Sequence, residues 1–162
     1  MLVNAAATDA PGPAEEMPVA DWQRVVAVSL TAPFLLSRAV FPHMRAAGGG
    51  TIVNVSSVAG RRGWARASAY CATKFGLTGL TQALAAEGAP HNIRVISVYP
   101  GAMATHWGTW SAADRDQPRR AAPEDSLPPE DVAGYIGWLV CAPAHVIVTE
   151  AVVAPIRERG WP

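Results

Sequence analysis

The sequence has little of several features that would point to a structural or nucleic-acid-binding protein. Its two cysteines, Cys71 and Cys141, have neither disulfide-framework nor zinc-site spacing, so no metal is expected, and a reducing cytoplasm is the expected location. The 13 basic and 13 acidic residues give a formal net charge of zero. The arginine pairs Arg61-Arg62 and Arg119-Arg120 are isolated from each other. No basic surface for nucleic acid is therefore expected.

Long apolar runs are also missing. No uninterrupted stretch reaches the roughly 18 apolar residues typical of a membrane-spanning helix, so no membrane association is expected. The N-terminus has no basic segment ahead of an apolar stretch, which argues against a signal peptide. Half of the 162 residues are apolar, and a chain of this length can bury a sizeable core. A single globular domain over residues 1–162 is therefore expected.

Lysine is the scarcest charged residue, because Lys74 stands alone and every other Lys/Arg position is arginine. It follows a tyrosine by four residues, in Tyr70-Cys71-Ala72-Thr73-Lys74. On a helix, residues four apart lie on one face. An ammonium group there can lower the pKa of a phenol and still donate to a sugar hydroxyl, which makes the pair a candidate acid/base site. The alternative is an amphipathic helix with a lysine reaching toward solvent.

Two β-branched runs read as buried strands of an α/β sheet. One is Thr51 to Ser57, which follows three glycines, and the other is Ile93 to Tyr99, which is closed by Pro100-Gly101. Ser57 would thus lie at the carboxyl end of a strand, where ligands bind in open parallel sheets. Taken alone, Ser57 is equally explained as a turn hydroxyl.

The remaining segments are expected to alternate between helix, loop and strand. Ala20-Asp21 would cap a helix that runs to about Ala47, and Pro129 would open another. The other expected elements are a loop from Asp9 to Pro18, a helix from Ser68 to Ala89, a helix end near Cys141 and a last strand from His145 to Val153.

In order and spacing, these segments resemble the short-chain dehydrogenases/reductases over nearly the whole chain. The matching segments are Leu2-Val3-Asn4-Ala5-Ala6, Trp22 to Leu36, Ile52 to Gly60, Ala69 to Lys74, Pro100-Gly101 with Thr105, and Pro129 to Ala133. The C-terminal Pro155-Ile156-Arg157 is similar to a different branch of reductases from those that end in a Gly-Gly tail.

The resemblance implies an NAD(P)-dependent oxidoreductase that transfers hydride between a nicotinamide cofactor, NAD or NADP, and a small carbonyl or alcohol substrate. Tyr70 would be the general acid or base, Ser57 would orient the carbonyl, and Lys74 would assist Tyr70 and hold the nicotinamide ribose. The implied fold is a partial doubly wound, Rossmann-like parallel sheet of about four strands that lacks the first βαβαβ half.

The resemblance also assigns residues around that triad. Asn4, Pro100, Gly101 and Thr105 are expected to bind the cofactor together with Tyr70 and Lys74. Ser29 stands where the family usually has an asparagine whose carbonyl holds a proton-relay water. Pro33 lacks the N–H that would bond the Ser29 carbonyl, so that carbonyl is expected to be free. Pro33 is otherwise explained as a simple helix kink.

Residues 102 to 128 correspond by position to the substrate lid. Trp64, Met103, Trp107 and Trp110 are the expected substrate contacts, which favours an apolar or aromatic carbonyl compound. The alternative is that these side chains only pack the lid against the sheet edge. His106 is expected to be a partly exposed lid residue rather than a metal ligand.

A glycine-rich turn between a strand and a helix is absent, although family members run to roughly 250 residues and carry one near the start. The sequence is therefore interpreted as N-terminally truncated. The alternative function is an inactive relative that acts as an oligomerisation partner or is a non-functional fragment. Small and apolar residues on the Trp22 and Ser68 helices predict a homodimer or homotetramer.

Overall fold

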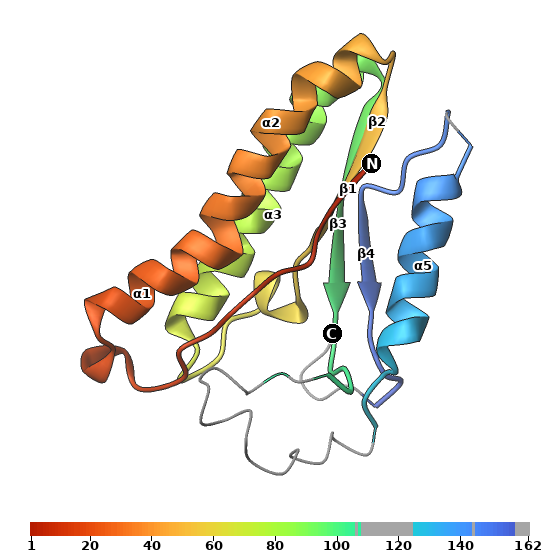
Figure 1. The fold of residues 1–162 in the computed structure, drawn as a ribbon. Helices are drawn as coiled ribbons and strands as arrows, with labels where there is room; N and C mark the ends of the chain where they lie inside the picture. The colour runs from red at the N-terminus through yellow and green to blue at the C-terminus, as the bar shows by residue number, and fades with distance from the viewer. Residues whose placement is uncertain (106, 108–124, 144, 158–162) are drawn as a thin grey trace.

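The computed structural model describes residues 1–105, 107, 125–143 and 145–157. Its centre is a four-stranded parallel sheet with the strand order β1-β2-β3-β4, so chain order and spatial order coincide (Figure 1). The strands are β1 (Leu2–Asn4), β2 (Gly50–Val55), β3 (Ile93–Pro100) and β4 (Glu150–Val153). This confirms the partial doubly wound sheet expected from the sequence.

Helices cover the sheet on both faces (Figure 1). One face carries α1 (Val19–Val26), the π-helical turn η2 (Ala27–Thr31), α2 (Ala32–Ala46) and α3 (Ser68–Gly88), and the other carries α5 (Pro129–Cys141). Three short 3-10 turns, η1 (Ala14–Glu16), η3 (Val58–Gly60) and η4 (Ala89–His91), connect these elements.

The core has one part on each face of the sheet, because successive side chains of β2 and β3 point to opposite faces. Ile52 and Val95 pack with Met44 and Leu84 on the α2 and α3 side. Val53, Ile96 and Val98 pack with Leu139 on the α5 side. Both central strands are therefore buried on both faces, as parallel strands usually are, and their ends are fixed in space by packing.

Pro33 changes the hydrogen bonding of the helix in which it lies. The helical run from Val19 to Ala46 widens at η2, where the Ala32 amide donates to the carbonyl of Ala27, five residues back. Such a π-turn accommodates a proline that cannot donate to the Ser29 carbonyl. On the facing helix, a Cβ at Gly76 would come within 2.9 Å of the Leu30 side chain, so α3 crosses this turn at close range.

Two expected boundaries are wrong. The first helix begins at Val19 after an extended Pro18, so Asp21 lies inside its first turn and bonds Arg24 at 3.1 Å instead of capping the helix. The last strand begins at Glu150 rather than His145. Arg94 explains this difference, because its guanidinium binds the carbonyl of Val146 at 3.3 Å, where a longer strand would use a backbone amide.

One helical run would be long and apolar enough to cross a membrane by length and composition alone. Within Val19–Ala46 an 18-residue window reaches a mean hydropathy of 1.6, although no uninterrupted apolar run occurs there. Only 22% of that window is buried in the fold. The inner side of the run, with Val25, Ser29 and Ser37, is buried. The outer side therefore carries apolar surface that this chain alone leaves uncovered.

Candidate active site

Tyr70 and Lys74 lie one turn apart on α3, with both side chains buried against the sheet. The Lys74 Nζ donates to the Val55 carbonyl at 2.8 Å, at the end of β2. It lies 5.6 Å from the centre of the Tyr70 ring. The i, i+4 spacing in the sequence thus becomes a phenol and an ammonium group that share one space at the carboxyl end of the sheet.

Burial favours the neutral forms of both groups, so it shifts their pKa values in opposite directions. It raises the pKa of Tyr70 to about 12, an effect that a hydrogen bond with Ser57 opposes and the nearby charge of Asp9 reinforces. Burial also lowers the pKa of Lys74 to about 8. At neutral pH the pair is therefore a protonated phenol beside a desolvated cation that is ready to lose its proton.

Ser57 completes this group from the turn that follows β2. It is the N-cap residue of η3, because its Oγ accepts from the Ala59 amide at 3.1 Å. The turn lies directly on α3, since a Cβ at Gly60 would come within 2.8 Å of the Lys74 carbonyl. This close approach brings Ser57 next to Tyr70, although 13 residues separate them in the sequence. Three hydrogen-bonding groups thus converge from two elements.

Ser29 and Asn4 use their side chains within the fold. The Ser29 Oγ binds both the amide and the carbonyl of Thr8 at 3.2 Å, which ties η2 to the segment after β1. The Asn4 amide donates to Asn54 at 2.7 Å and so joins β1 to β2. The Asn4 Oδ1 is buried and has no hydrogen-bond partner within the described residues. That oxygen is therefore available to accept a hydrogen bond from a ligand.

The expected cofactor turn lies where β3 ends. Pro100 is the last residue of β3 and is buried, and the Gly101 amide donates to the Val153 carbonyl at 2.9 Å. Thr105 follows, and its Oγ1 accepts from the Trp107 amide at 3.3 Å. These contacts fix the turn to β4, at the same end of the sheet as Ser57.

An aromatic side chain, Trp107, lies over the Tyr70 phenol. The Trp107 ring lies 4.8 Å from the Tyr70 ring, centre to centre, at an angle of 53°. Met103 forms an isolated bridge with Leu127, which joins the two ends of the segment expected to be a lid. Trp64 is half exposed. Trp110 and His106 lie outside the described residues.

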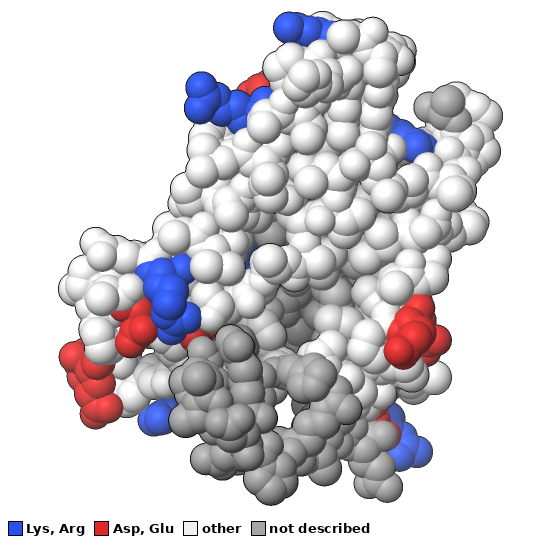
Figure 2. Space-filling model, viewed as in Figure 1, with Lys and Arg blue, Asp and Glu red and all other residues white. Residues whose placement is uncertain are grey.

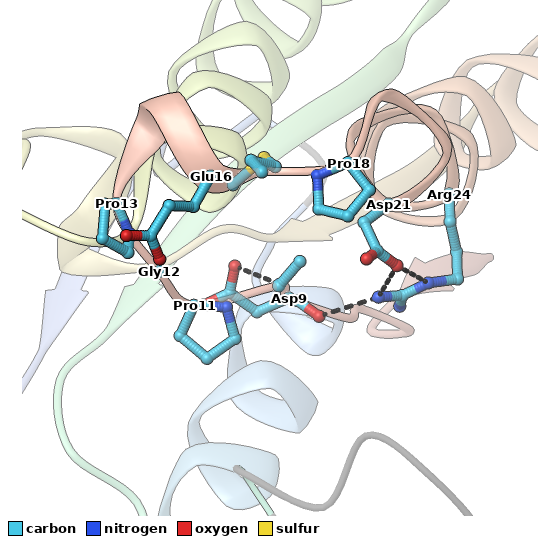
Figure 3. Close-up of a pocket in the computed structure, with 10 residues that line it drawn as sticks. Asp9, Pro11, Gly12, Pro13, Glu16, Pro18, Asp21 and Arg24 are labelled. Carbon is cyan, nitrogen blue, oxygen red and sulfur yellow. Dashed lines mark hydrogen bonds and ion pairs between the residues drawn. The ribbon is translucent and has the colours of Figure 1, made fainter.

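Sequence reasoning predicted the loop that precedes α1 but missed the role of Asp9 within it. Figure 3 shows Asp9, Glu16, Asp21 and Arg24 around a pocket of about 260 Å³, with Arg24 bonded to the Asp9 carbonyl at 3.2 Å. Ser57, Tyr70 and Lys74 do not line this pocket. Asp9 matters to the site because it is largely buried and its charge acts on Tyr70. An acidic residue within a Pro-rich loop gave no sequence signal for that role.

The residues present fit the nicotinamide end of a cofactor. Lys74 has three N–H donors and uses one on Val55, while Tyr70 presents a hydroxyl beside it. Lys74, Tyr70 and the Pro100-Gly101 turn would hold the ribose and the nicotinamide. In the described part of the chain, no group of three or more His, Cys, Asp or Glu residues could hold a metal ion.

Comparison with known proteins shows which family and which relatives the chain is similar to. The model of the short chain dehydrogenase family matches residues 1–116. A trans-4-hydroxycyclohexanecarboxylate dehydrogenase of Sinomonas cyclohexanicum is 44% identical over 105 residues, 65% of this chain and 40% of the relative. A 3-alpha-(or 20-beta)-hydroxysteroid dehydrogenase of Mycobacterium bovis is 41% identical over 114 residues, 70% of this chain and 44% of the relative. The chain thus spans less than half the length of these relatives.

Solved structures agree on the fold. A 4-hydroxyisoleucine dehydrogenase complexed with NADH superposes with a TM-score of 0.79 at 31% identity, covering 95% of this chain and 66% of that one. A metagenomic short-chain oxidoreductase in complex with NADP gives 0.77 at 34% identity, covering 95% and 60%. Both kinds of nicotinamide cofactor therefore occur among the similar structures.

Proposed function

The chain belongs to the short-chain dehydrogenase family, and from that premise we propose that it oxidises a cyclic secondary alcohol, or reduces the matching ketone, with NAD or NADP. The observation that supports this most is the convergence of Ser57, Tyr70 and Lys74 at the carboxyl end of β2. Their burial, hydrogen bonds and mutual distances suit transfer of a proton to or from a substrate oxygen.

In the proposed reaction, Tyr70 is the group that moves the proton. In reduction, its phenol donates to the carbonyl oxygen, while the Ser57 hydroxyl donates a second hydrogen bond to the same oxygen. A bound nicotinamide supplies or accepts the hydride. In oxidation, Tyr70 must first lose its proton, and the positive charge of Lys74 stabilises the phenolate. Burial raises the pKa of Tyr70 to about 12, so the phenol is protonated at neutral pH before oxidation begins.

The assignment of cofactor-binding residues follows the same geometry. Tyr70 and Lys74 would bind the nicotinamide ribose, and Pro100, Gly101 and Thr105 would contact the nicotinamide end. The backbone carbonyl of Ser29 is proposed to hold a relay water, because Pro33 cannot donate to it. Asn4 is proposed to contribute through Oδ1, since its amide group already binds Asn54.

A ring-shaped substrate is proposed from two observations. Trp107 lies across Tyr70 and offers flat apolar surface there, to which Met103 at the start of the same segment and Trp64 in the loop before α3 are proposed to add. One relative is named for a 4-hydroxycyclohexanecarboxylate and another for a 3-alpha-(or 20-beta)-hydroxysteroid, and both of these compounds contain aliphatic rings. A flat aliphatic ring buries well against an indole, whereas a short polyol would leave its hydroxyls unpaired there.

The test is a turnover assay with cyclohexanol and 4-hydroxycyclohexanecarboxylate, using NAD⁺ and NADP⁺ each at several times their apparent KM. We expect formation of reduced cofactor with at least one cyclic alcohol, and about tenfold lower kcat/KM with a linear diol. Absence of turnover with every secondary alcohol and both cofactors would overturn the proposal. The alternative of an inactive relative lacks support, because the similar proteins are named as dehydrogenases.

Pairing of two copies is proposed from the uncovered face of the long helices. Phe34, Leu35 and Leu36 on α2 and Phe75 on α3 are each exposed by 44 to 50%. In the view of Figure 2, few charged side chains lie over the middle of the molecule, and the blue and red groups lie near its margins. Burying these side chains in a homodimer, or in a homotetramer, would remove apolar surface from water. Light scattering at micromolar concentration would test it, and a monomeric mass would contradict it.

A further inference from the structure

Arg61 follows the turn that carries Ser57, and no step described so far uses it. Its Nη1 lies 2.6 Å from the Glu150 Oε2, on the first residue of β4. The guanidinium also stands over the ring of Tyr99, 4.9 Å from its centre. Tyr99 is fully buried and directly precedes the Pro100-Gly101 turn. One side chain therefore links the Ser57 turn to β3 and β4.

The other oxygen of Glu150 is held by the catalytic helix. The Gln82 Nε2, on α3, donates to the Glu150 Oε1 at 3.0 Å. That hydrogen bond and the positive charge of Arg61 lower the pKa of Glu150, so its carboxylate stays ionised at neutral pH. Glu150 thus binds two partners at once, one on the turn and one on the helix that carries Tyr70 and Lys74.

The opposite side of the turn is fixed by close packing. Gly60 leaves no room for a Cβ against the Lys74 carbonyl. The single proton of the Thr78 hydroxyl is shared between the Lys74 carbonyl at 3.1 Å and the Gly60 carbonyl at 3.4 Å. Arg61 is the next residue, and its side chain extends away to Glu150. The backbone from Ser57 to Arg61 is therefore held by α3 through Gly60 and by β4 through Arg61.

We propose that Arg61 is a positioning residue, whose ion pair with Glu150 holds the Ser57 turn so that the serine hydroxyl stays aligned with the Tyr70 phenol and the reacting oxygen. The proposal rests on the proposed function. Arg61 and Glu150 are 38% and 25% exposed, and ion pairs with such exposure contribute little to folding. Their effect on alignment can be larger, because misplacement by about 1 Å can cost about 100-fold in rate.

The test compares Arg61→Ala, Glu150→Gln and the double variant, with Arg61→Lys as the conservative change. Arg45→Ala, an exposed arginine near the far end of α2, is the matched control. The measurements are kcat, the KM for cofactor, and the primary isotope effect with an alcohol deuterated at the reacting carbon. Loss of folded enzyme would lower kcat while leaving the KM and the isotope effect unchanged.

We expect Arg61→Ala and Glu150→Gln each to lower kcat about tenfold and to raise the isotope effect, because misalignment slows the hydride step itself. The cofactor KM should stay within about twofold. The double variant should be no slower than either single variant, since both remove one interaction. Arg61→Lys should recover part of the rate. Unchanged kcat and isotope effect in Arg61→Ala, or losses that multiply in the double variant, would overturn the proposal.

A second measurement works without turnover. The amides of Ala59, Gly60 and Arg61 are bonded within the turn, to the Ser57 Oγ, the Ser57 carbonyl and the Val58 carbonyl. Hydrogen exchange at these amides should be about tenfold faster in Arg61→Ala and unchanged in Arg45→Ala. Unchanged exchange in Arg61→Ala would refute the positioning role. Faster exchange in a chain that oxidises no alcohol would refute the proposed function, while showing that Arg61 still holds the Ser57 turn.

Discussion

The two parts of the site differ in how firmly the chain holds them. Ser57 lies between β2 and η3, and Tyr70 and Lys74 lie on α3, where Lys74 is bonded to Val55 and the Ser57 turn packs closely against α3. Asn4 lies on β1, a three-residue strand at the edge of the described sheet. The proton-transfer groups thus have neighbours on all sides, while the strand on the other side of the site is paired only once.

The residues for proton transfer and the residues for dinucleotide binding are therefore distributed differently along the chain. The acid/base pair needs one helix turn and one strand end, so it is complete within Ser57 to Lys74. Dinucleotide binding needs a glycine-rich turn at a helix N-terminus beyond β1, and the sequence contains no such turn. We therefore expect the described chain to resemble a whole enzyme in proton chemistry and to differ from one in cofactor affinity.

Tyr70→Phe should have the largest effect. It removes only the transferable proton, and general acid catalysis contributes up to about 10⁴-fold, so a loss of roughly 1,000-fold in kcat is expected. The fold should be unchanged, because the ring still packs against Trp107. Steady-state kinetics with a cyclic ketone measures the loss, and circular dichroism checks the fold. A variant that keeps a tenth of the wild-type kcat would rule out Tyr70 as the proton donor.

Lys74→Met tests the cost of the buried cation. Burial lowers the Lys74 pKa from 10.5 to about 8, so the unfolded chain binds the proton more tightly than the folded chain. The resulting destabilisation is full below about pH 8, fades as the pH rises to about 10.5, and amounts to about 3 kcal/mol. The variant also loses the hydrogen bond to Val55, and this loss offsets about 1 kcal/mol of the stability that it gains.

Urea unfolding of the cofactor-free chain should therefore show Lys74→Met to be more stable than wild type by about 2 kcal/mol near pH 7. The gain should disappear near pH 10, while the variant loses turnover at both values. Lys74→Arg keeps the charge and is the matched control, for which no gain is expected. An equal difference in stability at both pH values would contradict the assigned cost of charge burial.

Asn4→Ala tests how the edge strand is attached and should have the smallest effect. The Asn4 amide donates to Asn54, and Asn54 donates to Thr81 on α3 at 2.8 Å. Removing the first member of this chain should cost about 1 to 2 kcal/mol of unfolding free energy. Val3→Ala, on the exposed side of the same strand, is the control. If the two variants were equally stable, the side-chain link would not be what holds β1.

Much of this architecture was predictable from sequence, for local reasons. The β-branched runs at 51–57 and 93–99 gave β2 and β3 almost in full, and Pro129 gave the first residue of α5. Ser57 was expected at the carboxyl end of a strand, where ligands bind, and the family resemblance placed it with Tyr70. The site geometry agrees, while the catalytic roles remain predictions.

Other features depended on contacts that no local pattern encodes. Arg94 shortens β4 by binding carbonyls from a segment about 50 residues away, and Arg61 pairs with Glu150 across 89 residues. The side chain of Ser29 is engaged by Thr8, which spacing alone could not indicate. Sequence patterns therefore predicted elements well, whereas the polar contacts between elements required the folded structure.

The most direct test compares two ligands on the 162-residue chain. Reduced nicotinamide mononucleotide carries only the nicotinamide half, while NADH adds the adenosine diphosphate half. If the described residues hold the first half alone, fluorescence titration should give both ligands about the same Kd, near millimolar, which corresponds to about 4 kcal/mol. A Kd for NADH that is 100-fold tighter than that for the mononucleotide would contradict the account.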